Sequence, residues 1–349
     1  MVNGTAKCLS KPVVSLLLVN VFLPGTSNFW QNLFTFGMNC QRIYKGFRMP
    51  IQKIDAAGNL RGSMFMLLAM ASFAIGDTIM KTVSDTLPLS QILVIRGCFA
   101  IVCFFLIALY VGALRHPRVI FAPAFMLRLI GEVVASLFFL TALFNMPIAN
   151  ASAIMQALPL TVSLGAAYFF GEAIGWRRIL AITVGLFGVL LIVKPGYEGF
   201  TIYSVYCLIA VLGTTLRDLA TRKVDKSIPS IYVSLITVVV IVLMGLLMSL
   251  FQPWAPANAE EVLTLGAASI FLMTGFIGIV SAMRVGEVAV VTPFRYTVLI
   301  FAVILGYLVF KEIPDIVTII GSCIVVASGL YTLYRENFMA RRKRKAERT

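Results

Sequence analysis

Charged side chains stand inside some of the most apolar stretches of this 349-residue chain. Arg128 and Glu132 are four residues apart in one such stretch, so a helix would bring them to the same face. A charge at the centre of a bilayer costs about 2.5–3.5 kcal/mol on insertion scales, so we expect these charges to be paired or to serve a function. Two interpretations follow: a structural ion pair within one helix, or a site that contacts a substrate or a proton.

A second group of candidates lies beside a proline. Arg295 and Tyr296 follow Pro293, which removes a backbone donor and can kink a helix so that a carbonyl is freed. A cation and an aromatic ring beside such a kink would suit a planar anionic or ring-bearing ligand. Gln156 corresponds to Tyr296 in the internal repeat described below, and its amide could donate to a substrate. The predicted substrate site is therefore Arg128, Glu132, Gln156, Arg295 and Tyr296.

Two further pairs of charges share the four-residue spacing and also recur in the repeat. They are Asp77 with Lys81 and Asp218 with Arg222. We predict that they act as gating contacts, one pair for each side of the membrane. The alternative is that Lys81 and Arg222 anchor helix ends by reaching the lipid headgroups.

The residues of familiar catalytic sites are missing from the sequence. Its single histidine, His116, lies in a predicted loop, and H-E-x-x-H, G-x-S-x-G and Walker-type motifs are absent. The six cysteines show no C-x-x-C spacing, so neither a metal site nor a disulfide framework is indicated. We expect no enzyme activity, no metal and no cofactor.

The elements that position these residues are apolar helices. Apolar residues make up 60% of the chain, charged residues 13%, and the mean hydropathy is +0.94, which indicates a membrane protein. Stretches of about 18 or more apolar residues predict bilayer-crossing helices. We find ten, at 63–82, 90–113, 122–144, 148–170, 177–194, 203–221, 231–251, 262–283, 288–310 and 315–335.

The ten helices form two copies of one pattern. A shift of 140 or 141 residues places Ala142 on Ala282, Glu172 on Glu312, and Lys81 on Arg222. Each copy holds five spans, and two odd copies in one membrane must have opposite orientations. The sequence therefore predicts an all-α integral membrane protein with ten transmembrane helices in two inverted five-helix repeats, 63–198 and 199–335.

Basic residues predict the orientation. If the N-terminus is cytoplasmic, 22 of the 29 Lys and Arg lie on that side, three lie on the other, and four lie inside helices. Positive residues concentrate in cytoplasmic segments, so we expect both termini inside. The basic tail, 336–349, is expected to touch anionic lipid rather than nucleic acid. Residues 1–62 are expected to be a leader that is disordered or precedes the true start, with Met49 and Met64 as alternative starts.

Several segments together resemble the EamA-type transporters of the drug/metabolite transporter superfamily. They are residues 138–160, 282–296, the Gly-Glu and Lys-Glu loops at 171–172 and 311–312, and Pro88 with Arg96 at the start of a predicted span. The resemblance implies ten helices in two inverted repeats, with a cavity lined by helices 1, 3, 4, 6, 8 and 9 and with helices 5 and 10 peripheral.

The same resemblance implies transport of small metabolites across a bacterial inner membrane. The runs 306–312 and 327–331 are similar to members that import riboflavin or S-adenosylmethionine. We expect a secondary transporter that takes up a vitamin or another ring-bearing metabolite by alternating access, with riboflavin the first candidate. An exporter of amino acids or amines is one alternative, and a channel or non-transporting scaffold is another. A small-molecule substrate and a homodimer are the expected partners.

Overall fold

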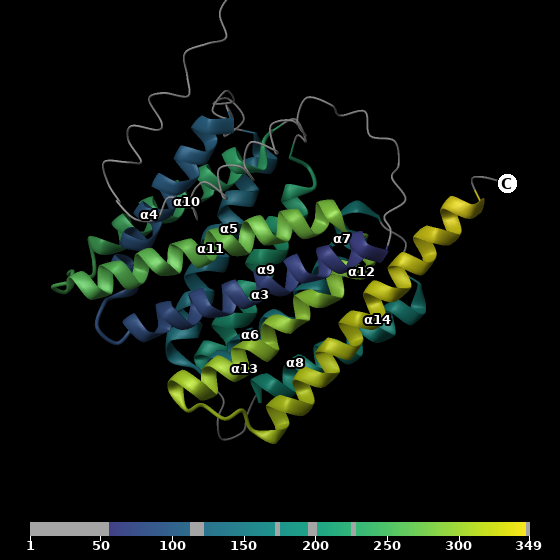
Figure 1. Ribbon diagram of the computed structural model, residues 1–349. Coiled ribbons are helices and arrows are strands. Elements are labelled where there is room, and N and C mark those ends of the chain that lie inside the picture. Colours follow the sequence, from purple (N-terminus) through teal and green to yellow (C-terminus); the bar gives the residue numbers. More distant parts are fainter. Residues whose placement is uncertain (1–55, 112–121, 172–174, 195–200, 225–227, 347–349) are drawn as a thin grey trace, which may run out of the picture. The chain divides into compact units, whose positions relative to one another are not determined.

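The computed structural model describes residues 56–111, 122–171, 175–194, 201–224 and 228–346. Within these ranges the regular elements are all helices, and ten segments are long and apolar enough to cross a membrane, which confirms the predicted fold class (Figure 1). The elements are α3 (Ala56–Val83), α4 (Leu89–Val111), α5 (Pro123–Asn145), α6 (Ile148–Met155), α7 (Leu158–Phe170), α8 (Trp176–Val193), α9 (Ile202–Thr221), α10 (Ser230–Ser249), α11 (Ala259–Val285), α12 (Val288–Val291), η2 (Thr292–Tyr296), α13 (Thr297–Phe310) and α14 (Ile316–Ala346).

Two of the predicted helices are broken. The span 148–170 divides into α6 and α7 at Gln156, and the span 288–310 divides into α12, the 3₁₀ turn η2 and α13. A proline follows or lies in each break, Pro159 in the first turn of α7 and Pro293 in η2, where its missing N–H removes a helical hydrogen bond. The breaks occupy equivalent places in the two repeats and face each other, because Gln156 Nε2 donates to the Tyr296 carbonyl at 3.4 Å.

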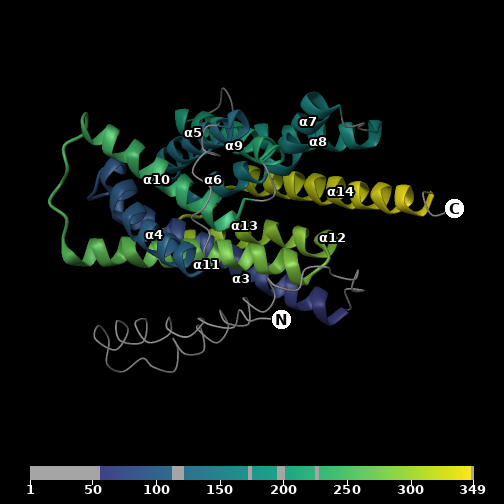
Figure 2. The same cartoon turned by 90° about the horizontal axis from the view of Figure 1, so that it is seen from above.

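The long helices pack in pairs that the repeat relates to one another. α5 packs along α9, and the equivalent α3 packs along α11, while α4 pairs with α10 and α8 with α14 (Figure 2). α6 and α7 join α5 and α9, and we call these four the α5 bundle. α12, η2 and α13 join α3 and α11, and we call these five the α3 bundle.

A close glycine crossing fixes α5 against α9. A Cβ on Gly131 would lie 2.8 Å from the Gly213 carbonyl oxygen and 2.7 Å from the Arg217 nitrogen. A Cβ on Gly213 would lie 2.8 Å from the Ala135 nitrogen. Because only hydrogen fits at these two positions, the backbones touch. Glu132, the neighbour of Gly131, is thereby carried to the side of Arg217.

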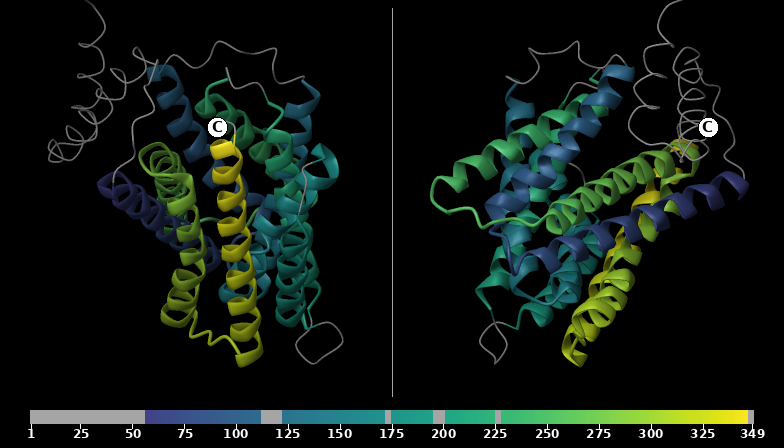
Figure 3. Two further views of the ribbon diagram at one scale, coloured as in Figure 1. Left: turned by 90° about the vertical axis from the view of Figure 1, so that its right-hand side faces the viewer. Right: turned by 60° about the vertical axis from the view of Figure 1, so that its left-hand side comes forward.

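The helix ends define two opposite faces. α13 ends beside the start of α14 (bottom of Figure 3, left). Lys81 near the end of α3 contacts Glu312, just past α13, and the Met146 carbonyl, just past α5, so these helices end on one face, which we call the Lys81 face. α7, α9 and α11 end on the other, which we call the Arg222 face. α14 continues past the predicted end at 335 to Ala346, so the backbone of most of the basic tail is helical. The predicted leader lies outside the described residues, except for its last few positions, which begin α3.

Candidate functional site

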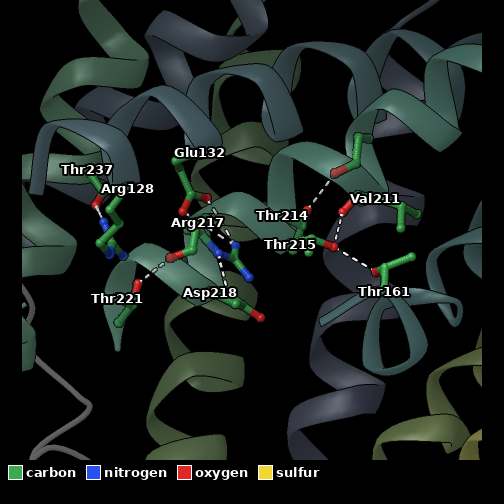
Figure 4. Close-up of polar contacts among 11 residues, drawn as sticks. Arg128, Glu132, Thr161, Val211, Thr214, Thr215, Arg217, Asp218, Thr221 and Thr237 are labelled. Carbon is green, nitrogen blue, oxygen red and sulfur yellow. Dashed lines mark hydrogen bonds and ion pairs between the residues drawn. The ribbon is translucent and has the colours of Figure 1, made fainter. Parts of the chain in front are cut away.

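Arg217 of α9 is the centre of a cluster of charges between helices. Its Nη1 lies 3.4 Å from both carboxylate oxygens of Glu132 on α5, and its Nε donates to Asp218 Oδ1 at 2.8 Å (Figure 4). The Glu132, Arg217 and Asp218 side chains are 15%, 25% and 32% exposed. The ion pair therefore joins the first repeat to the second at a place that water can reach.

Arg128 does not pair with Glu132 along α5. Its Nη1 donates instead to Thr237 Oγ1 of α10 at 2.6 Å, and Figure 4 shows Arg128 directed toward Thr237. Thr237 in turn donates to the Val233 carbonyl at 2.7 Å. Arg128 Nε is buried without an acceptor in the described part of the chain. Arg128 and Glu132 therefore form no ion pair along α5, although their charges interact, and each side chain contacts a partner on another helix.

Arg295 adds a third guanidinium from the α3 bundle. It stands on η2, where its charge interacts with those of Asp218 and Arg217. It forms no hydrogen bond or ion pair with any described residue. Three arginines and two carboxylates thus meet at one level of the bundle, which leaves an excess of one positive charge when all five are ionised.

Gln156 and Tyr296 lie at the two helix breaks and bind each other. The carbonyl that the break frees at Tyr296 accepts from Gln156, which is itself buried. The Tyr296 hydroxyl reaches Gly329 of α14 and is buried with no partner among the described residues. Of the five predicted substrate contacts, the structure brings Arg128, Glu132 and Arg295 around Arg217 and leaves the other two in an adjacent layer.

The residues predicted to gate do not form the pairs suggested by their spacing. Lys81 Nζ donates to Glu312 Oε1 at 2.7 Å and to the Met146 carbonyl at 2.6 Å. Asp77 interacts electrostatically with Arg96 of α4. Asp218 belongs to the charge cluster, and Arg222 stacks over the Phe170 ring at 6.0 Å from its centroid.

Arg217 and Glu312 were absent from the predicted sites. Arg217 is one of four Lys and Arg residues that lie inside the predicted spans away from their ends, which was a usable signal. Glu312 follows a predicted span and matches Glu172 in the repeat. Both signals were present, but neither says which helix will supply the partner.

A separate ion pair on the Lys81 face joins the two peripheral helices. Lys194 Nζ lies 2.7 Å from Asp315 Oδ2, with the Asp315 side chain 43% exposed. Partial burial alone would raise the pKa of Asp315, but hydrogen bonds from Lys194 and Thr318 and the Lys194 charge outweigh it and hold that pKa below its ordinary value. This pair bonds to no group of the α5 or α3 bundle among the described residues.

Two apolar grooves lie on the flanks of the helices. One, of about 550 Å³, lies between α8 and α14 and is bordered by Trp176, Arg177 and Tyr331. The other, of about 540 Å³, lies between α7 and α9 beside Thr161 and Thr215, whose hydroxyls are 2.7 Å apart. Their linings are largely aliphatic and aromatic, which suits acyl chains better than a polar solute.

Comparisons with known proteins agree with this architecture. The model of the EamA-like transporter family matches residues 60–194 and 201–334, one match for each predicted repeat. A solved crystal structure superimposes with a TM-score of 0.56 at 17% identity, over 80% of this chain and 97% of the other, which supports the fold.

The curated relatives carry transporter names. The chain is 24% identical to an S-adenosylmethionine uptake transporter of Rickettsia prowazekii, covering 79% of this chain and 94% of the relative. It is 26% identical to the pseudopaline exporter CntI of Pseudomonas aeruginosa, covering 76% and 94%. It is 25% identical to a riboflavin transporter of Vibrio cholerae, covering 82% and 97%. With ten apolar spans and both repeats matched, the protein is a multi-pass membrane protein that belongs to the EamA-like transporter family of the drug/metabolite transporter superfamily.

Proposed function

We propose that this protein is a secondary carrier that takes up a small, ring-bearing organic metabolite across a bacterial inner membrane by alternating access. The observation that carries the proposal is the cluster around Arg217, where charges from both repeats meet beside two broken helices. In carriers built from inverted repeats, substrates bind near the midplane at discontinuous helices. Intramembrane charges of this kind are expensive to keep and are expected to serve the transported solute.

The cluster favours a solute that carries a carboxylate. Its excess of one positive charge would be neutralised by one monoanionic group. Arg295 and the Nε of Arg128 are donors without a bonded acceptor among the described residues, and both stand at the cluster. A carboxylate placed between them would gain charge-assisted hydrogen bonds in a medium of low dielectric constant.

Two solutes from the names of the relatives separate the possibilities. S-adenosylmethionine has an amino-acid carboxylate and an adenine ring, whereas riboflavin has a ring system without a carboxylate. Riboflavin was the narrowest expectation from the sequence. The carboxylate of S-adenosylmethionine suits Arg295 and Arg128, whereas its ammonium and sulfonium groups would need Glu132 and Asp218 as partners. The predicted orientation, with both termini cytoplasmic, places the Lys81 face outside.

Counterflow in proteoliposomes tests the proposal. Purified protein is reconstituted, the vesicles are loaded with one unlabelled solute, and entry of the same labelled solute is followed. A carrier for S-adenosylmethionine shows saturable counterflow that Arg295→Gln reduces about tenfold or more, since a hydrogen bond to a charged group is worth about 1.5–3 kcal/mol. Flux without counterflow would indicate a channel, and no flux of any supplied metabolite would indicate a scaffold. Counterflow of riboflavin that ignores Arg295→Gln would contradict the carboxylate preference while leaving the carrier function intact.

A further inference from the structure

The corner between α5 and α6 is held by two charged side chains of the α3 bundle. Lys81 Nζ, at the end of α3, donates to the Met146 carbonyl at 2.6 Å. Glu312 Oε2, just past α13, accepts from the Ile148 amide at 2.9 Å. Lys81 and Glu312 also bind each other at 2.7 Å, and their side chains are only 10% and 20% exposed. We call this arrangement the Lys81 clasp.

The charges of the clasp match the helix ends that they hold. Met146 is the C-cap residue that follows the last residue of α5, at the helix end where carbonyl groups lack helical partners and carry partial negative charge. Ile148 begins α6, where amide groups lack partners and carry partial positive charge. A cation on the first and an anion on the second stabilise both ends at once. The ion pair therefore binds the α5–α6 corner in addition to joining α3 to α13.

The held corner closes the gap between the two bundles on the Lys81 face. The Ile148 side chain is 1% exposed and packs into the space left by Gly306 of α13, where a Cβ would come within 2.8 Å of its Cγ2. Lys81 also lies 4.9 Å from the centre of the Phe310 ring. Movement of the corner away from α13 would expose Ile148 to water.

The repeat places a second set of the same groups on the Arg222 face. Arg222 corresponds to Lys81, Phe170 to Phe310, and the corner of residues 286–288 to the held corner. Arg222 stacks over Phe170 as Lys81 does over Phe310. The corner there has another partner, however, because the Glu287 amide donates to Asn59 Oδ1 of α3 within its own bundle at 2.8 Å.

Helix packing shows the same difference between the faces. On the Lys81 face, α6 packs against α13 and α14. The symmetry-related pairs, α12 with α7 and α12 with α8, have no comparable packing among the described residues. The bundles are thus joined more closely on the face that carries the clasp.

We propose that Lys81 and Glu312 are the gate on the Lys81 face. They keep this face closed by binding the backbone of the α5–α6 corner. The corner must separate from both side chains before the charge cluster around Arg217 becomes accessible from this face. The inference rests on the proposed carrier function. In the other half of the cycle, Arg222 binds the α11–α12 corner and closes the Arg222 face. This assigns Glu312, which the spacing of charges did not single out, a role in the transport cycle.

Labelling of one cysteine tests the gate without any solute. In a variant whose six native cysteines are replaced, Ile148→Cys reports on the corner through its reaction with a membrane-impermeant maleimide added on the Lys81 face. Lys81→Ala and Glu312→Ala each remove one charge-assisted hydrogen bond to the corner. We expect labelling to accelerate about tenfold or more, because such bonds are worth about 1.5–3 kcal/mol. Arg222→Ala is expected to slow labelling, since it weakens the alternative closure.

The Lys194–Asp315 pair supplies the matched control. It has the same 2.7 Å separation on the same face but joins the peripheral helices α8 and α14. Asp315→Ala should leave the labelling rate of the Ile148→Cys protein unchanged. The gate is refuted if Lys81→Ala and Glu312→Ala label no faster than Asp315→Ala in protein that remains monodisperse. Glu312→Gln serves if the alanine variant does not fold, because it keeps an acceptor for the Ile148 amide and should accelerate labelling less.

A charge swap separates the corner contacts from the ion pair itself. Lys81→Glu with Glu312→Lys keeps opposite charges between α3 and α13 but presents a carboxylate to the Met146 carbonyl and an ammonium to the Ile148 amide. Fast labelling of the swapped protein supports the clasp, and a return to the slow rate would overturn it. Labelling requires no transport. If the protein shows counterflow but fails this test, the gate proposal is refuted and the proposed carrier function stands.

Discussion

Removal of the Glu132 charge is the sharpest test of the cluster. At about 4 Å and an effective dielectric constant of about 20, two unit charges attract by about 4 kcal/mol before desolvation is counted. Arg217 keeps a second partner in Glu132→Gln, because its Nε still binds Asp218 at 2.8 Å. We therefore expect this variant to lose about 1–3 kcal/mol of unfolding free energy, less than the roughly 3–5 kcal/mol that follows when a buried charge is orphaned.

Arg217→Gln should be the more damaging change. It leaves Glu132 and Asp218 close together in the membrane without their shared cation, and a loss of about 3–5 kcal/mol is expected. In the double variant Glu132→Gln/Arg217→Gln the two losses of unfolding free energy should not add. The loss should be smaller than the sum of the two single losses by about 1–3 kcal/mol.

The assay combines unfolding in detergent with uptake measured per folded molecule. Glu260→Gln, on the exposed first turn of α11, is the matched control and should change neither quantity. If Arg217→Gln lowers the unfolding free energy no more than Glu132→Gln does, or if the two losses add fully, the ion pair does not contribute to stability as its geometry implies. If Arg128→Met with Glu132→Leu folds and transports normally, these charges contact neither substrate nor proton.

Three other predictions concern packing, pH and topology. Gly213→Ala should destabilise the protein by about 1–3 kcal/mol through overpacking of the α5–α9 crossing, whereas Gly175→Ala, with open space around it, should stay within about 0.5 kcal/mol in the same unfolding assay. Because the folded-state pKa of Asp315 is lowered, its contribution is present above the unfolded value and is lost as the pH falls through the folded value; Asp315→Asn should cost less than about 1 kcal/mol at neutral pH, and this difference should vanish in acid melts. Reporter fusions after Pro256 should lie outside and those after Lys343 inside, and the opposite result at Lys343 would overturn the orientation.

The spans were predictable from the sequence because a bilayer imposes a minimum apolar length that few soluble segments reach. The break at Gln156 was not, since Pro159 falls in the first turn of α7, where a proline is compatible with an uninterrupted helix start. The partner of Glu132 was missed for a related reason. Spacing along one helix identifies neighbours on that helix only, and the Gly131–Gly213 crossing brings a cation from another helix into reach.

At the Lys81 face, the match between the two repeats predicted more than the spacing of charges along one helix did. It matched Glu312 with Glu172 and Lys81 with Arg222, and the structure places Glu312 on Lys81. The backbone groups that the pair binds could not be foreseen, because the turn from α5 into α6 depends on how the chain leaves one helix and enters the next.

The ion pair between α5 and α9 has a consequence for the synthesis and membrane insertion of the protein. Glu132 leaves the ribosome 85 residues before its partner Arg217. At a synthesis rate of about 5–20 residues per second, Arg217 follows roughly 4–17 s after Glu132, and until then the Glu132 carboxylate lacks this partner. During that interval Glu132 must stay hydrated or be shielded by the insertion machinery. We therefore expect the amino-terminal half, expressed alone, to be degraded quickly in the cell and to be rescued when the carboxy-terminal half is supplied on a second transcript.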